Sequence, residues 1–188
     1  MQPGRTAPLT VALYQPDIPQ NTGTILRMCA CLGLAAAIIE PAGFLASDKH
    51  FRRAGMDYLA HVEITRYPHW AAFEAWRRVT GRRLVLLTTK AGLAYTAFSF
   101  LPGDILLCGR ESAGVPAEVH TAADARLVIP LKPPMRSLNV AVAAAMVAGE
   151  ATRQLRRKLM TFHPEMTHSS WPCGGRKMAS TLLSGVKY

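Results

Sequence analysis

Short, continuous apolar runs recur along this chain of 188 residues, separated by longer segments in which apolar residues follow a helical spacing. Runs of this kind are typical of parallel strands that helices cover on both faces. The predicted strands are Leu9–Tyr14, Ala35–Glu40, Val62–Thr65, Leu84–Thr88, Asp104–Cys108 and Leu127–Ile129. The predicted helices are Gln20–Leu32, Asp48–Ala54, Trp70–Val79, Pro116–Ala122 and Leu138–Leu159. This alternation predicts an α/β domain built around a mainly parallel sheet.

The alternation stops after Leu159, and this sets the expected domain organisation. We expect one domain over residues 1–159 and an irregular, basic and solvated tail over residues 160–188. Residues 1–8 lack the apolar core of a secretory signal, and the longest apolar stretch, Val140–Gly149, is well short of the roughly 20 residues that cross a membrane. We therefore expect a cytoplasmic protein with no membrane segment.

Charge narrows the range of partners. The 22 Lys and Arg residues outnumber the 12 Asp and Glu residues, which gives a formal net charge of +10. Such an excess suits a polyanion, because each neutralised phosphate releases counterions. A basic protein without a nucleic-acid role stays open at this point. The four cysteines are too few and too scattered for a disulfide framework, and no Cys/His spacing typical of a zinc site occurs, so no metal is expected.

Familiar nucleotide and hydrolase motifs are missing from the sequence. No GxGxxG follows a predicted strand and no GxxxxGK[ST] occurs, which argues against a dinucleotide-dependent dehydrogenase and a P-loop NTPase. Candidate chemistry must come from the turns that leave the strands, because ligand crevices in parallel sheets lie beyond the carboxyl ends of the strands. Three such segments stand out: Asn21–Arg27, Gly109–Gly114 and Pro130–Asn139.

The first of these segments opens the first predicted helix. Asn21 and Thr22 are good helix caps, because their side chains accept hydrogen bonds from the free amides of a first turn. Capping does not explain Arg27, which stands among apolar neighbours on a helix that otherwise faces the core. An arginine in that setting indicates an anionic partner, so we interpret Arg27 as a residue that contacts a phosphate or the substrate.

The other two segments combine turn residues with isolated polar groups. Gly109 would let a ligand approach the backbone closely. Glu111, just beyond a buried strand, is either an anion at a helix start or a hydrogen-bond acceptor for a ligand. Ser137 and Asn139 begin an alanine-rich helix, which a cap explains. A buried Asn139 would also need a partner, because an unpaired amide costs roughly 1–3 kcal/mol.

A fourth segment, Asp48–Tyr58, is basic and ends on an aromatic ring. A charge run is usually a solvated helix face. Followed by a tyrosine, it also suits a surface for phosphates and bases. Both interpretations stay open from the residues alone.

Taken together, these segments resemble the SPOUT class of RNA methyltransferases, of the SpoU/TrmH type. Within that class they are most similar to bacterial enzymes that methylate the ribose 2′-hydroxyl of the tRNA wobble nucleotide. The resemblance runs in order from about Leu9 to Gln154, and the full ordered set is far more specific than any one segment. The segments read LYQPDIPQNTGTILRMCACLG, IIEPAGF, DKHFRRAGMDY, LLTTK, LLCGRESAGVP, IPLKPPMRSLNVAVAAAM and GEATRQ.

The resemblance implies a fold, a cofactor and an assembly. The fold is an α/β SPOUT fold with a C-terminal trefoil knot, an exception to the rule that chains do not knot. The assembly is a homodimer that shares its RNA site between subunits. S-adenosyl-L-methionine is bound largely through backbone groups of the knot loops. The implied cofactor-binding residues are Leu87, Thr88, Gly109, Glu111, Ile129, Ser137 and Leu138.

The implied reaction is methylation of nucleotide 34, a cytidine or modified uridine, in the anticodon loop of tRNA. Arg27 matches the family's catalytic arginine, with Asn21 beside it. A guanidinium holds its proton too tightly to act literally as a base. We therefore expect Arg27 to stabilise the developing alkoxide and to clamp a neighbouring phosphate. The implied RNA-binding residues are Lys49, Arg52, Arg53, Tyr58 and Arg136.

The chain departs from the family pattern at two places. Val140 and Ala141 stand where Leu-Ser is common, and Gly149 stands where a tyrosine commonly precedes the helix glutamate. The first change weakens the wobble-position assignment more than the reaction. Two alternatives therefore stay open: the same reaction on ribosomal RNA or another tRNA site, and a non-catalytic RNA-binding protein.

Overall fold

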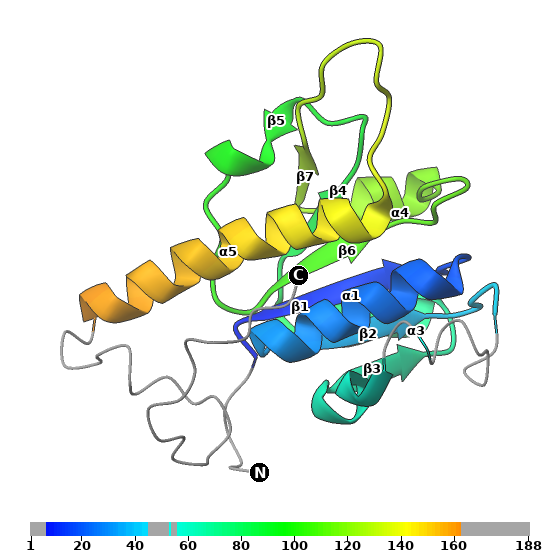
Figure 1. Ribbon diagram of the computed structural model, residues 1–188, viewed down its shortest axis with the longest axis horizontal. Helices are drawn as coiled ribbons and strands as arrows, with labels where there is room; N and C mark the ends of the chain where they lie inside the picture. The colour runs from blue at the N-terminus through cyan, green and yellow to red at the C-terminus, as the bar shows by residue number, and fades with distance from the viewer. Residues whose placement is uncertain (1–6, 45–52, 54–55, 163–188) are drawn as a thin grey trace, which may run out of the picture.

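A computed structural model describes residues 7–44, 53 and 56–162 of the chain. At its centre is a sheet of seven strands in the order β3-β2-β1-β6-β4-β7-β5, and every pairing between them is parallel (Figure 1). The strands are β1 (Leu9–Tyr14), β2 (Ala35–Ile39), β3 (Ile64–Tyr67), β4 (Leu84–Leu87), β5 (Leu93–Ala94), β6 (Asp104–Cys108) and β7 (Ala125–Val128). The prediction of a mainly parallel sheet is confirmed.

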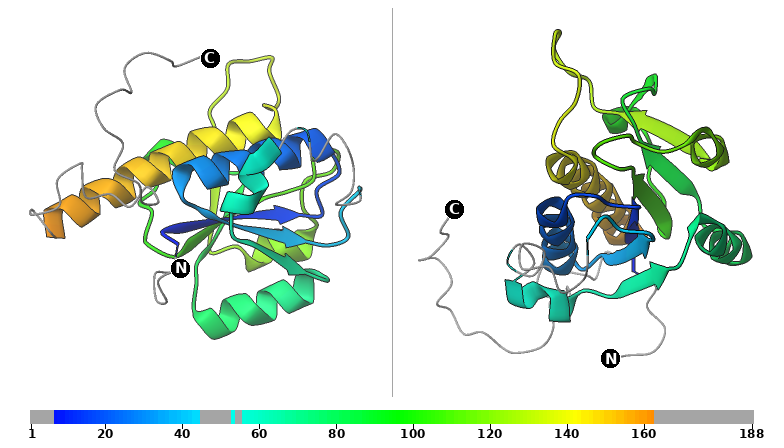
Figure 2. Two further views of the ribbon diagram at one scale, coloured as in Figure 1. Left: turned by 60° about the horizontal axis from the view of Figure 1, so that its bottom comes forward. Right: turned by 90° about the vertical axis from the view of Figure 1, so that its right-hand side faces the viewer.

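Helices cover both faces of this sheet (Figure 2). On one face lie α1 (Pro19–Leu32) and α5 (Val140–Phe162), which pack against each other, and on the other lie α3 (Trp70–Thr80) and α4 (Ala117–Ala122). The short helices η1 (Met56–His61) and η2 (Tyr95–Ala97) are of the 3-10 type. Over the described residues, no helix has both the length and the apolar character that a membrane crossing requires.

The central strand β1 shows why both layers form. Val11 and Leu13 pack with the α1 and α5 side of the core, whereas Ala12 and Tyr14 pack with Phe73 of α3 on the other side. Successive side chains of a strand point to opposite faces of its sheet. Because both faces are covered, every residue of β1 is buried. A strand in this position is therefore mostly apolar, as in the run seen in the sequence. The buried Thr10 hydroxyl of β1 accepts a hydrogen bond from Arg82 at 2.9 Å.

Residues with restricted backbones set the limits of α1. Ile18 is the extended N-cap residue, and Pro19 stands in the first turn, where its missing N–H removes no helical hydrogen bond. Gly33 ends the helix in the left-handed conformation, with φ of 68°. Asn21 and Thr22 consequently lie inside the helix, and their interpretation as caps is wrong.

The other predicted elements agree with the structure within a few residues. β3 begins at Ile64 instead of Val62, and α5 runs past its expected end at Leu159 to Phe162. β5, η1 and η2 are missing from the prediction, because segments this short show no period. Of the predicted helix Asp48–Ala54, only Arg53 belongs to the described residues. The division into a domain over 1–159 and a tail over 160–188 stays a prediction.

Candidate active site

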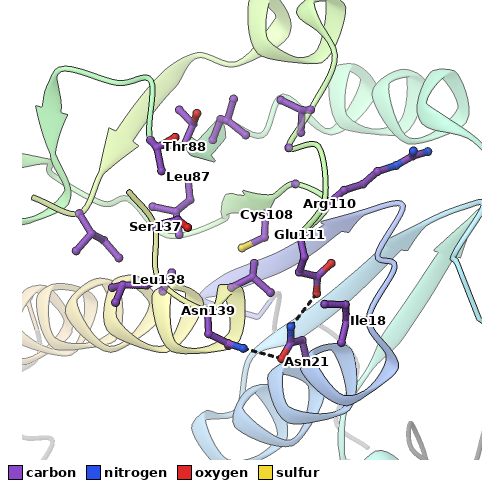
Figure 3. A pocket seen from close by; sticks show the side chains of 18 of the residues that line it. Ile18, Asn21, Leu87, Thr88, Cys108, Arg110, Glu111, Ser137, Leu138 and Asn139 are labelled. Carbon is purple, nitrogen blue, oxygen red and sulfur yellow. Dashed lines mark hydrogen bonds between the residues drawn. The ribbon is translucent and has the colours of Figure 1, made fainter. Parts of the chain in front are cut away.

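A cavity of about 480 Å³ opens at the carboxyl ends of β4, β6 and β7 (Figure 3). Its wall comes from the start of α1, from the segments that leave these three strands, and from the start of α5. Most of the wall is apolar, with a few polar groups, which is the usual make-up of a pocket for a small organic molecule. The expected crevice beyond the strand ends is therefore confirmed.

Every cofactor-binding residue implied by the resemblance lines this cavity. These residues are Leu87, Thr88, Gly109, Glu111, Ile129, Ser137 and Leu138. The segment after β4 is held to β7, because the Thr88 N–H donates to the Leu127 carbonyl at 2.9 Å. The residues are far apart in the sequence, so the fold brings them together. That they bind a ligand stays a prediction.

The turn after β6 is closed by its own backbone. Arg110 and Gly114 exchange backbone hydrogen bonds of 3.0 and 2.9 Å, and Gly114 has a φ of 68°. A Cβ on Gly109 would lie only 2.7 Å from the carbonyl carbon of Gly114. The absence of a side chain at Gly109 is thus required by the turn itself. That a ligand also approaches the backbone closely at Gly109 stays a prediction.

A chain of hydrogen bonds joins three parts of the wall (Figure 3). Asn21 Nδ2 donates to Glu111 Oε1 at 3.2 Å, and Asn139 Nδ2 donates to Asn21 Oδ1 at 2.9 Å. Asp17 extends the chain, because its carboxylate accepts the N–H groups of Glu111 and Ser112 at 3.1 and 3.2 Å and the Ser112 hydroxyl. These bonds fix the orientation of the Asn21 amide at the mouth of the cavity.

The two carboxyl groups of this network differ in acidity. Burial raises the pKa of Glu111, and the neighbouring Asp17 carboxylate raises it further. Burial acts on Asp17 in the same direction, but hydrogen bonds with Glu111 and Ser112 outweigh it and hold the pKa of Asp17 well below its usual range. Asp17 therefore carries the charge of the pair, and Glu111 takes up a proton first as the pH falls.

Asn139 caps the last helix and couples it to the first. Its Oδ1 accepts the N–H groups of Ala141 at 2.8 Å and Val142 at 3.3 Å, while its amide nitrogen reaches Asn21. The partner that we expected for Asn139 is thus Asn21, although Asn139 is exposed and not buried as assumed. Both polar atoms of the Asn139 side chain are therefore hydrogen-bonded.

Arg27 lies outside the cavity of its own chain. It stands on the exposed side of α1, and its guanidinium carbon is 4.7 Å from the centre of the Tyr58 ring. Asn21, less than two turns earlier, lines the cavity. Within one chain, then, the structure does not bring the two predicted catalytic residues to the same place.

Of the predicted RNA-binding residues, the structure describes Arg53, Tyr58 and Arg136. Arg53 and Arg136 are exposed and do not line the cavity. Lys49 and Arg52 lie outside the described residues. Sequence reasoning missed Lys90 and Lys132, which are exposed directly after residues of the wall. It also missed Asp17, although an acid just after the first strand was a usable signal.

This fold and cavity define an α/β protein with a small-molecule site at the carboxyl ends of its strands. A comparison with known families narrows the class. Residues 8–149 match the model of the SpoU rRNA Methylase family, and the chain belongs to that family.

Individual relatives share most of their length with this chain. A protein of Beijerinckia indica subsp. indica, tRNA (cytidine(34)-2′-O)-methyltransferase, is 72% identical over 145 residues, which are 77% of this chain and 91% of the relative. A solved structure described as giving structural insights into the 2-OH methylation of C/U34 on tRNA is 43% identical, with a TM-score of 0.75 over 79% of this chain and 97% of its own. The SpoU methyltransferase AviRb from Streptomyces viridochromogenes, in complex with the cofactor AdoMet, is 28% identical, with a TM-score of 0.75 over 82% and 63% of the two chains.

Proposed function

We propose that this chain transfers a methyl group from S-adenosyl-L-methionine to the ribose 2′-hydroxyl of the wobble nucleotide, position 34, of tRNA. The nucleotide is a cytidine or a modified uridine, and the anticodon loop is the partner. The observation that carries the proposal is the 72% identity with a relative named for the methylation of cytidine 34. The net charge of +10 supports an RNA substrate.

The cavity suits the cofactor in size and chemistry. Its volume of about 480 Å³ is in the range of pockets for small cofactors, and its charged lining residues are Arg110 and Glu111. S-adenosyl-L-methionine supplies a methyl group that a sulfonium makes electrophilic. Cys108 in the wall stays a neutral thiol, because burial, with a further contribution from Glu111, raises its pKa to about 12. No thiolate at Cys108 therefore competes for the methyl group at neutral pH.

Arg27 and Asn21 are the residues that we assign to the reaction. A ribose hydroxyl is a weak acid, so the enzyme must stabilise the alkoxide that develops as the oxygen attacks the methyl carbon and its proton passes to water. Arg27 donates to that oxygen and clamps the neighbouring phosphate, keeping its own proton. Asn21, held by Glu111 and Asn139, supports the approach of the ribose.

A second copy of the chain completes this site. Apolar side chains at the start of α5 and in the loop before it are exposed, namely Met135, Leu138, Val142 and Met146. Such a row is typical of a surface that another protein chain covers. Arg27 also lies on the exposed side of α1, which packs beside α5. In the homodimer, Arg27 of one protomer reaches the cavity of its partner.

Three further features belong to the same proposal. The C-terminal part of the domain is threaded as a trefoil knot, and the enzyme works in the cytoplasm, where tRNA is modified. The basic residues Lys49, Arg52, Arg53 and Arg136 contact the phosphates of the anticodon stem and loop, together with Tyr58. These assignments rest on the family pattern.

The substrate assignment is tested with purified enzyme, S-adenosyl-L-methionine and two tRNA transcripts that differ only at nucleotide 34. One carries ribose and the other 2′-deoxyribose at that position. We expect methyl transfer to the first transcript alone, because the second lacks the accepting oxygen. Nucleoside mapping of tRNA from cells without the gene should show loss of one 2′-O-methylated wobble nucleoside. Equal labelling of both transcripts would rule out position 34 as the target.

The role of Arg27 is tested by single-turnover methylation with saturating tRNA. Removal of a group that stabilises developing charge costs about 10²–10³-fold in rate, so we expect that loss for Arg27→Ala and a smaller loss for Arg27→Lys. Arg78→Ala is the matched control, because Arg78 is an exposed arginine of α3 on the other face of the sheet. Wild-type rates for both Arg27 variants would remove Arg27 from the mechanism.

A further inference from the structure

Arg27 and Tyr58 form a cation–π pair on the exposed side of α1. The guanidinium carbon lies 4.7 Å from the centre of the ring, inside the distance of roughly 6 Å at which such contacts are attractive. Tyr58 is 36% exposed. The contact is therefore near the solvent, and the guanidinium covers one face of the ring.

The ring stands on a support that the buried core holds in place. Tyr58 belongs to η1, which lies against α1 (Figure 2). Its neighbour Leu59, and Val62 just after η1, pack against the buried core. The fold therefore determines the position of the tyrosine ring. Arg27 ends a long, flexible side chain on an exposed helix face.

We propose that Tyr58 is a positioning residue for Arg27 and holds its guanidinium in the orientation that methyl transfer requires. This inference rests on the catalytic role proposed for Arg27. It also changes the role of Tyr58, which the family pattern assigns to RNA binding. The ring acts on the substrate through Arg27.

An aromatic ring is well suited to this task. A free arginine side chain occupies many rotamers, and restricting it beforehand reduces the entropy lost when the reacting groups align. A carboxylate could also restrict it, but its negative charge would offset the positive charge that the alkoxide needs. The face of a ring attracts the cation without neutralising it.

The alternative for Tyr58 is a stacking platform for a base of the anticodon loop. A platform contributes to the affinity for tRNA, because stacking is worth roughly 1–3 kcal/mol per base. A positioning residue contributes to the rate at saturating tRNA. The two roles therefore separate when the dissociation constant and the single-turnover rate are measured on the same variants.

The experiment uses Tyr58→Phe and Tyr58→Leu, each alone and combined with Arg27→Ala, in the full chain. Tyr58→Phe keeps the ring, so its rate should stay within about twofold of wild type, whereas Tyr58→Leu should lose about tenfold. Affinity for tRNA should change by less than about twofold in both. In the Arg27→Ala background, Tyr58→Leu should cause no further loss, because the group that it orients is gone.

Trp76→Leu is the matched control. Trp76 of α3 holds Arg82 in a similar pair, 5.4 Å from its ring centre, on the other face of the sheet. This variant should keep the wild-type rate, and thermal unfolding of every variant shows which are folded.

Three results would overturn the inference: a tenfold loss in Tyr58→Phe, a loss confined to tRNA affinity, or losses that multiply in the double variant. Failure of the proposed function looks different. In that case the wild type transfers no methyl group to tRNA, or Arg27→Ala is fully active.

Discussion

The two ends of the sheet differ in how their charged groups are arranged. At the amino ends of the strands, Arg83 donates hydrogen bonds to both carboxylate oxygens of Asp104, at 2.8 and 2.7 Å. At the carboxyl ends, by contrast, the two carboxyl groups of Asp17 and Glu111 lie together. The pairing at the amino ends continues beside β7. There Arg77 bridges Glu74 at 2.7 Å and Asp124 at 3.0 Å. The carboxyl pair is held by Asn21, Ser112 and backbone N–H groups, and within the described residues neither of its members makes a salt bridge.

The two ends of the sheet therefore use charged groups differently. The ion pairs at the amino ends stabilise the fold, whereas the two carboxyl groups at the carboxyl ends belong to the candidate site. Opposite charges in contact stabilise one arrangement of the strands. Because these groups are already paired with each other, they are not available to interact with a ligand. Two acids in contact cost free energy, because one of them resists ionisation. Such costs are concentrated at functional sites. We therefore expect changes at the amino ends to affect stability and changes at the carboxyl ends to affect binding and catalysis.

The largest effect is expected at the amino ends, for Asp104→Ala. The Asp104 side chain is 2% exposed, and besides Arg83 it accepts the Leu101 N–H at 2.8 Å. Its removal leaves a partly buried guanidinium without its counter-charge, which costs about 3 kcal/mol or more. Urea denaturation measures the loss, and calorimetry should show unchanged affinity for S-adenosyl-L-methionine in the folded variant.

Glu118→Ala provides the control for that prediction. Glu118 is an exposed acid at the start of α4, and its removal should change the free energy of unfolding by less than about 0.5 kcal/mol. A similar loss of unfolding free energy in both variants would mean that the Asp104–Arg83 pair contributes no more to stability than an exposed acid does.

The next effect is expected at the carboxyl ends, for Gly109→Ala. The added methyl group must displace the backbone of Gly114, which costs about 1–3 kcal/mol, and it deforms the wall of the cavity. We expect affinity for S-adenosyl-L-methionine to fall about tenfold, or roughly 1.4 kcal/mol. Calorimetry and urea denaturation measure the two changes.

Gly149→Ala adds the same methyl group where there is space. Gly149 lies on the exposed side of α5, and apart from its chain neighbours and the backbone of its own helix, nothing in the described part of the protein comes within 4 Å of its ideal Cβ. The free energy of unfolding should rise by up to about 1 kcal/mol, because alanine is the better helix former. Wild-type cofactor affinity in Gly109→Ala would contradict the functional role of the carboxyl ends.

The smallest effect concerns pH and the pair Asp17 and Glu111. The folded protein holds the Glu111 proton at pH values where the unfolded chain, with a pKa of 4.5, has released it. Wild-type stability therefore falls as the pH rises from 4.5 through the raised pKa of Glu111. Glu111→Gln lacks this fall, so its stability relative to wild type should increase over the same interval, as urea denaturation across pH would show.

Asp17→Asn should behave in the opposite way. The pKa of Asp17 is lowered on folding from 3.8, so its charge stabilises the wild type above that value and ceases to do so at lower pH. The free energy of unfolding of the variant should therefore decrease relative to that of the wild type as the pH rises through 3.8. The same pH trend in both variants would show that folding does not shift the pKa values of the two carboxyl groups in opposite directions.

The fold was largely predictable because its elements depend on local pattern. Strands covered on both faces are mostly apolar, and β1, β2, β4 and β6 were found for that reason. β5 has two residues, and among the described strands it pairs only with β7, so its existence depends on where β7 lies. Local sequence carries no such information.

The candidate site was predictable in its members but not in its connections. Segments after strands were singled out because carboxyl ends of parallel strands meet, and all the expected cofactor residues line one cavity. The contacts of Asn21 and Gly109 were missed for one reason. Asn21 bonds Glu111 and Asn139, and Gly109 makes room for Gly114, so each depends on a contact that no single helix or strand defines.

The position of α5 has a consequence for biosynthesis. β1 is made first, yet it pairs with β6 and is covered by α5, the last helix described. Contacts between such distant segments slow folding. The part of the β1 face that α5 covers therefore stays exposed until α5 has left the ribosome. Because the start of α5 also lines the cavity, a nascent chain completes the core on this face of the sheet and its binding site in the same step.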